Sequence, residues 1–136
     1  MSATVARYLR AWLLVPAAVL PTGSALAHHS FSAEFDVSRQ VELTGSVTEI
    51  EWTNPHAWVH LEVENAEGAV ERWAVEFLGV NALVRSGMSP RTVKAGDRLV
   101  IKGFGARNGS NTANASSARR ADTGESLWSS ARENRQ

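Results

Sequence analysis

The segment from Val41 to Thr48 alternates strictly between apolar and polar residues, and this pattern most limits the folds open to the chain. A period of two is typical of a β-strand with one buried face. The apolar phase then moves by one residue to Ile50 and Trp52, which predicts a bulge between Gly45 and Glu49, because a one-residue slip exchanges the two faces of a strand. We therefore expect a bent first strand. Its apolar side consists of Val41, Leu43, Gly45 and Val47.

Two more strands follow in the same style. Residues 53–56 (Thr-Asn-Pro-His) interrupt the first strand, since proline lacks a backbone donor and restricts the residue before it. Residues 58–64 predict a second strand, and residues 65–68 a hairpin turn in which Gly68 supplies the positive φ. A third strand comes next. The residues expected to point inward are Val59, Leu61 and Val63 in the second strand, and Trp73, Val75 and Phe77 in the third.

The second half of the chain changes period. Asn81 is suited to cap a short helix over residues 82–84, which Gly87 and Pro90 would end. A turn at 94–97 leads to a fourth strand at 98–104, with Leu99 and Ile101 pointing inward. The other expected elements are a polar loop over 105–114, a weak fifth strand at 115–121 and a short extended piece at 126–128.

Three strands, a short helix and two strands define an all-β class, with the element order of a small five-stranded OB-type Greek-key barrel. A bent, bulged first strand suits this architecture because it must cross both halves of the barrel. An open meander or a small sandwich built from the same elements is the alternative. We expect residues 28–40 to form an irregular N-terminal arm, residues 41–128 the single barrel domain and residues 129–136 a flexible tail.

Residues 1–27 have the pattern of a cleavable Sec-type signal peptide. Arg7 and Arg10 precede an apolar run of about ten residues, roughly half the length of a membrane span, and Ala25-Leu26-Ala27 is a small-x-small cleavage site. We expect a periplasmic or secreted protein with no stable membrane anchor after processing. Cleavage after Ala27 would leave about 109 of the 136 residues, beginning at His28.

The charge and the lack of cysteine exclude several classes. Removing Arg7 and Arg10 from fourteen basic residues leaves twelve against fourteen acidic ones, so the processed chain lacks the basic footprint of a nucleic-acid partner. With no cysteine, the domain holds no disulfide and depends on burial of its core. We find no nucleophile elbow and no phosphate loop. An enzyme is therefore the less favoured class, and a copper oxidoreductase lacks a defined substrate site.

Several segments together resemble the DUF6152 family of exported bacterial proteins of unknown function. The most specific of them is Trp52-Thr53-Asn54-Pro55-His56. The resemblance covers nearly all of the mature chain and is weakest after Asn114. It implies export but no activity, cofactor or site residue. The other segments that carry it are His28-His29-Ser30-Phe31, Phe35-Asp36, Leu43-Thr44-Gly45-Ser46-Val47, Trp73-Ala74-Val75-Glu76-Phe77, Asn81-Ala82-Leu83, Gly87-Met88, Lys94-Ala95-Gly96-Asp97 and Gly109-Ser110-Asn111-Thr112-Ala113-Asn114.

All four histidines lie between positions 28 and 60, and imidazole is the commonest side-chain ligand of transition metals. Cleavage after Ala27 would join a free amine and an imidazole in His28, a pair that chelates Cu(II). Cleavage one residue earlier would place His29 third, which suits a square-planar Cu(II) or Ni(II) site. His56 and His60 are the candidate additional ligands, although they would lie about 13 Å apart on an extended strand. The alternatives are that His28 and His29 are solvated and idle, that His56 is a loop histidine hydrogen-bonded to the backbone, and that His60 is exposed on the outer face of its strand.

Tryptophan is the other candidate binding group. Trp58 shares a face with His60, so it is suited either to stack a ligand on an open face or to cover the barrel mouth under the N-terminal arm. With Trp52, Asn54 and Pro55 it forms a predicted ligand or partner face. The leading hypothesis is a periplasmic module that binds an unknown small ligand, with copper held by the histidine arm. The alternative is a metal-free domain that docks on an envelope or secreted protein through the Trp-rich face.

Overall fold

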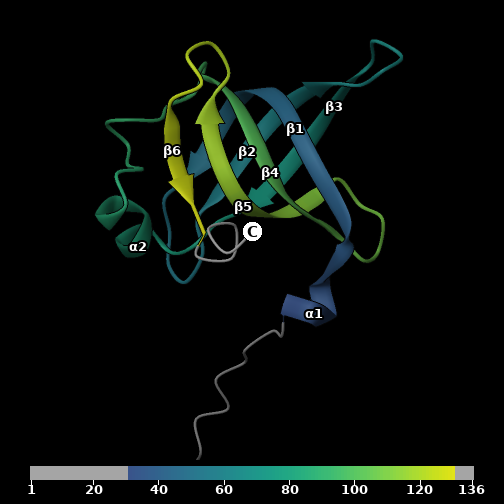
Figure 1. Ribbon diagram of the computed structural model, residues 1–136, viewed down its shortest axis with the longest axis horizontal. Coiled ribbons are helices and arrows are strands. Elements are labelled where there is room, and N and C mark those ends of the chain that lie inside the picture. The colour runs from purple at the N-terminus through teal and green to yellow at the C-terminus, as the bar shows by residue number, and fades with distance from the viewer. Residues whose placement is uncertain (1–30, 131–136) are drawn as a thin grey trace, which may run out of the picture.

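The computed structural model describes residues 31–130, in which six strands form one sheet in the order β3-β2-β1-β4-β5-β6. All-β is therefore the correct class. Figure 1 shows the strongly curved strands and the two short helices at the periphery. The elements are α1 (Phe31–Glu34), β1 (Phe35–Glu51), β2 (Trp58–Glu64), β3 (Val70–Glu76), α2 (Val80–Arg85), β4 (Arg98–Ala106), β5 (Thr112–Arg120) and β6 (Ser126–Ser129).

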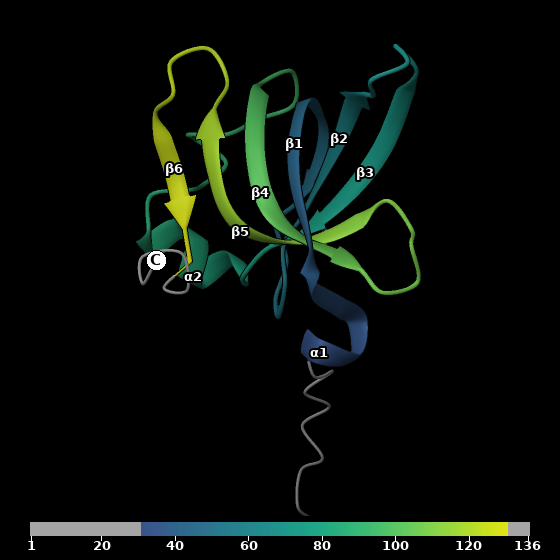
Figure 2. The ribbon, with the colours of Figure 1, turned by 45° about the vertical axis from the view of Figure 1, so that its right-hand side comes forward.

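A parallel pairing of β3 with β5 brings the two arms of the sheet together. All other strand pairs are antiparallel. Strands β1 to β5 thus form a barrel-like ring, with β2 and β3 on one side of β1 and β4 and β5 on the other (Figure 2). The ring and the helix between β3 and β4 fit the predicted OB-type order. Strand β6 pairs with the outer edge of β5. The sequence predicted only a short extended piece at this position, not a sixth strand of the sheet.

One row of paired residues runs around the ring. The row begins on β1 at Glu51 and ends on β1 at Gln40. This offset shows that the strands are staggered, as closure of a tilted sheet requires. Its side chains point outward, because the alternating neighbours on each strand are the buried ones. This belt consists of Glu51 on β1, Trp58 on β2, Glu76 on β3, Asn114 on β5, Phe104 on β4 and Gln40, again on β1.

The predicted bulge in β1 is confirmed. The pairing of β1 with β2 shifts register between Val47 and Glu49, so Thr48 and Glu49 are both exposed. Just before the bulge, a Cβ on Gly45 would lie 2.5 Å from the carbonyl oxygen of Glu62. A glycine is needed there because the two backbones approach too closely for any side chain.

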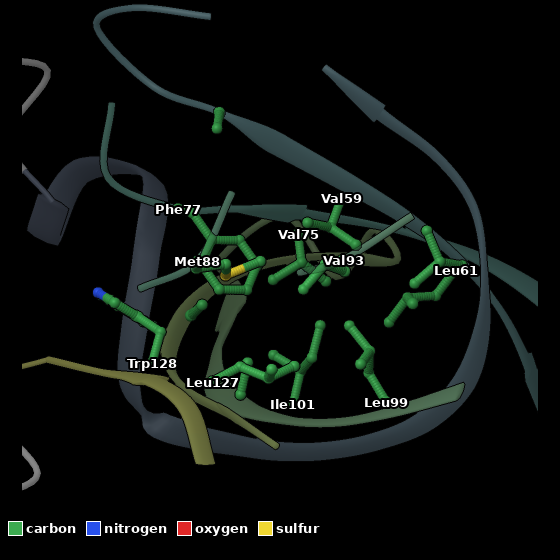
Figure 3. Packing of buried hydrophobic residues seen from close by; sticks show 14 of the residues in the cluster. Val59, Leu61, Val75, Phe77, Met88, Val93, Leu99, Ile101, Leu127 and Trp128 are labelled. Atoms are coloured by element: carbon green, nitrogen blue, oxygen red, sulfur yellow. The ribbon is translucent and has the colours of Figure 1, made fainter. Parts of the chain in front are cut away.

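The interior of the ring holds the predicted core. Val59, Leu61, Val75 and Leu99 are each at most 1% exposed, which confirms the inward register, while Val63 is half-buried and packs against their cluster. The segment between β3 and β4 adds three further buried side chains, Leu83, Met88 and Val93. In Figure 3 Phe77 and Trp128 close one side of this cluster, with ring centroids 5.2 Å apart.

Three boundaries differ from the sequence prediction. The arm predicted over 28–40 ends earlier, because α1 covers 31–34 and β1 already begins at Phe35, which pairs with Ala106. Strand β5 begins at Thr112, inside the predicted loop. The tail predicted from 129 is also partly ordered, since Ser129 ends β6 and the Ser130 amide donates to the Ser116 carbonyl.

The cap of α2 also differs. The N-cap is Gly79, without a side-chain hydrogen bond, and Asn81 lies inside the helix. Gly87 has the expected positive φ beyond its end, as does Gly68 in the hairpin. Among the described residues, neither helix has the length or apolar character needed to span a membrane.

Candidate functional site

The loop between β1 and β2 is held against the start of α2 by backbone hydrogen bonds. The Ala57 amide donates to Leu78 O at 3.2 Å, the Phe77 amide to Ala57 O at 2.8 Å, and the Val80 amide to Thr53 O at 3.2 Å. The peptide bond before Pro55 is cis. This loop (residues 53–57) therefore has a fixed position over one end of β3.

Gly79 lets the loop approach so closely. A Cβ at this position would lie 2.5 Å from Asn54 Oδ1 and 2.6 Å from the Pro55 carbonyl oxygen. Distances below 3.0 Å leave no room for a methyl group without movement of the loop. Asn54 and Pro55 are exposed, but one side of each residue packs against Gly79.

His56 projects from the loop toward Glu76, and its Nδ1 pairs with the Glu76 Oε1. The side chain of His56 is 50% exposed and that of Glu76 only 6%. Glu76 belongs to the outward-facing belt, so its burial results from the loop that covers it. An ionised carboxylate only accepts, so a neutral imidazole in this pair would hold its proton on Nδ1 and keep the lone pair of Nε2 available. This geometry is typical of a histidine oriented for metal binding by a carboxylate behind it.

His60 lies two residues further along β2 than Trp58 and forms a separate pair. Its Nε2 is 2.7 Å from Oε1 of Glu51, with both side chains partly exposed. The structure thus gives each of these two histidines its own carboxylate. Within residues 31–130 no group of three or more histidine and acidic side chains is arranged to hold a metal ion. His28 and His29 lie outside the described residues, as does the predicted signal peptide.

The predicted Trp-rich face is divided by the structure. Trp52 is half-buried and packs against the core cluster. Trp58 is also half-buried, on the outer face, and lines a hollow of about 340 Å³ beside α1 and the loop between β4 and β5. That Trp58 stacks a ligand or is covered by the N-terminal arm stays a prediction. The other residues that line the hollow are Ala33, Glu34, Phe35, Ala106, Arg107, Asn108, Ser110 and Thr112.

A second, more polar groove of about 440 Å³ lies over the outer face of β1, β2 and β3. His60 lies near its middle, with Glu49 opposite it on β1 and Ala74 opposite it on β3. Glu62 and Arg72 form the next pair along the strands, and their side chains are 3.7 Å apart. This groove combines charges of both signs, and Trp73 is the aromatic residue in its lining.

Sequence reasoning missed two contributors. Glu76 falls at an outward position of a regular alternation, which indicates exposure, and only the fold shows that the loop covers it. Arg107 lies in a segment predicted as a polar loop, and no local pattern joins it to α1, more than seventy residues earlier. Its Nε donates to the carbonyl oxygen of Ser32 at 2.6 Å.

Comparison with known proteins gives a family and no activity. A family model described as "Family of unknown function (DUF6152)" matches residues 17–115, more than half of the 136 residues. The match includes the loop at 53–57, Glu76 and all of β1 to β4. No curated protein matches the chain.

Proposed function

This chain belongs to the DUF6152 family, whose function is unknown, and from that premise we propose that it is an exported binding module that holds copper between its processed N-terminus and His56. The observation that carries the proposal is the pair of His56 with the buried Glu76. Export would generate the rest of the site, because cleavage near Ala27 frees an amine next to His28 and His29. A periplasmic or secreted location follows from the same step.

Glu76 is suited to support a metal ligand. A carboxylate behind an imidazole fixes its tautomer and raises its basicity as a ligand. His56 Nε2 then points away from Glu76, on a side chain that is half exposed, so an ion can reach it from outside. The hydrogen-bonded loop and the close contact with Gly79 hold this imidazole in place.

The described part of the chain begins beside the belt that carries Glu76. The Phe31 ring packs on Phe104, with centroids 5.7 Å apart. Phe104 and Glu76 belong to the same belt, two strand spacings apart, which is about 10 Å. His28 precedes Phe31 by three residues, and three residues span at most about 10 Å. We propose that an amine and imidazoles from this arm complete the site at His56.

The donor set matches the chemistry of Cu(II). Nitrogen ligands in a square-planar or T-shaped arrangement suit Cu(II), which also has the highest affinity of the divalent first-row ions for such donors. The amine and the imidazoles must lose protons to bind, so the affinity should fall in acid. His60 would stay outside the site, because it lines the separate groove over β1, β2 and β3.

Calorimetric titration of mature protein with a native N-terminus tests this function. We expect Cu(II) binding well above that of a free His-His-Ser peptide, a strong loss when a methionine precedes His28, and a loss in His56→Ala. His60→Ala is the matched control and should keep the affinity. Intact mass of the exported protein should show a start at Ala27 or His28. Affinity equal to that of the peptide, or unaffected by His56→Ala, would refute the proposed site.

The alternative function is a metal-free module that docks on an envelope or secreted partner. It is supported by Trp58, whose side chain is half-exposed on the outer face. Docking needs neither the free amine nor an imidazole, so an extra N-terminal methionine would leave partner capture intact. The same methionine variant thus separates the two functions.

A further inference from the structure

The hollow beside Trp58 differs in chemistry from the proposed copper site. Its volume of about 340 Å³ lies at the lower end of the range for small-ligand sites. Trp58 gives it one aromatic wall, and Ala33, Phe35 and Ala106 are its other apolar residues. Such a wall suits the face of a compact ring.

Arg107 is the cation of this hollow, and its orientation is fixed. Its backbone amide donates to Glu34 O at 2.9 Å and its side-chain Nε to Ser32 O at 2.6 Å. Both bonds attach it to α1. The terminal nitrogens of a guanidinium can make the paired hydrogen bonds by which arginine binds a carboxylate.

The remaining lining residues are small and polar. Asn108 uses Oδ1 to accept from the Ser110 amide at 3.0 Å, so its amide nitrogen can donate elsewhere. The hydroxyls of Ser110 and Thr112 both donate and accept. Groups that alternate in this way match a ligand with several hydroxyls.

We propose that this hollow is a binding site for a sugar acid, a hydroxylated ring that stacks on Trp58 and places its carboxylate on Arg107. A neutral sugar has no carboxylate to accept the paired hydrogen bonds of Arg107. A flat aromatic acid would leave the polar rim formed by Asn108, Ser110 and Thr112 without partners. A sugar acid has a ring face for Trp58, a carboxylate for Arg107 and hydroxyls for the polar rim. Neither a neutral sugar nor a flat aromatic acid has all three.

The test uses the mature protein with its native N-terminus and a chelator present, so that copper plays no part. D-glucuronate, D-glucose and benzoate are titrated while amide shifts are followed by NMR. We expect saturable binding of glucuronate, tighter than that of the other two. Arg107→Gln should weaken glucuronate by at least about tenfold, the effect of losing hydrogen bonds to a charged group, and leave glucose unchanged.

Two further variants complete the design. Trp58→Ala should weaken both sugars, and because Trp58 lies outside the core its circular dichroism spectrum should remain native. Arg72→Gln is the matched control, since this arginine is 88% exposed in the other groove, and should change nothing. Equal affinity for glucuronate and glucose, tighter binding of benzoate, or indifference to Trp58→Ala would overturn the proposal. So would binding that occurs only in a chain starting at Phe31, because the arm itself would then fill the hollow.

Discussion

The Nδ1 atom of His56 lies against the Oε1 atom of Glu76, so a half-exposed imidazole is joined to a carboxylate from which solvent is nearly excluded. The two residues come from different parts of the chain, a loop and the end of β3. The strand pairings of Trp58 with Glu51 and Glu76, and hydrogen bonds between that loop and residues 77–80, bring them together. The pair is thus a product of tertiary structure, with one side buried and one side open.

Glu76→Gln should weaken Cu(II) binding by about 10–100-fold, the usual effect of losing a carboxylate behind a metal ligand. Glutamine has a similar shape and can still accept from Nδ1, so the loop should keep its place. Calorimetry on the processed protein gives the measurement. Glu51→Gln alters the other histidine pair and is the control, expected to have no effect. A loss of equal size in both variants would contradict the role given to Glu76.

Gly79→Ala should destabilise the protein by about 1–3 kcal/mol, the usual cost of adding a methyl group to a packed contact. The new Cβ would meet Asn54 Oδ1 and the Pro55 carbonyl oxygen, so the loop must move. The free energy of unfolding is measured in urea. Asn81→Ala is the neighbouring control, because Asn81 is exposed inside α2 and does not cap it, and its effect should stay within about 0.5 kcal/mol. A neutral Gly79→Ala would show that the loop is not held as described.

The strand faces were predictable from the sequence because their periodicity is local. Val59, Leu61 and Val75 alternate with polar neighbours, and burial follows that alternation directly. The bulge near Val47 was also visible, since it changes the phase of the pattern. Local chemistry was thus sufficient wherever one face of a strand meets the core.

The beginning of β1 was not predictable in this way. Residues 35–40 mix apolar and polar types without a clear period, and β4 pairs with the two ends of this segment, Phe35 and Gln40. The burial of Glu76 and the position of Arg107 depend in the same manner on contacts with distant segments. Candidate histidines could be listed from the sequence, but the carboxylates that orient them required the fold.

Leu61→Ala should cost about 2–5 kcal/mol, because Leu61 is 1% exposed and the deletion leaves a cavity in the ring. Val63→Ala on the same strand should cost clearly less, since Val63 is half-buried. Urea denaturation of both variants measures the difference. A larger loss of unfolding free energy in Val63→Ala than in Leu61→Ala would contradict the burial described for β2.

Asp36 should titrate below the ordinary range of an aspartate. Its pKa is lowered first by the hydrogen bond from the Ser38 hydroxyl, then by that from the Ser38 amide, with smaller effects of Arg107 and Arg39. The two bonds to Asp36 Oδ1 measure 2.7 and 2.9 Å. Since the pKa is lower in the folded than in the unfolded chain, the stabilisation is complete above the unfolded pKa. It is lost as the pH falls through the folded value.

Ser38→Ala should therefore raise the pKa of Asp36 toward the ordinary value without restoring it fully, because the backbone amide at position 38 still donates. An NMR titration of the Asp36 carboxyl carbon measures the change. Added salt is the control: it screens the two arginines, which have the smaller effects, and should shift the pKa less than the substitution does. A larger shift with salt than with Ser38→Ala would show that charge, and not the hydroxyl, sets this pKa.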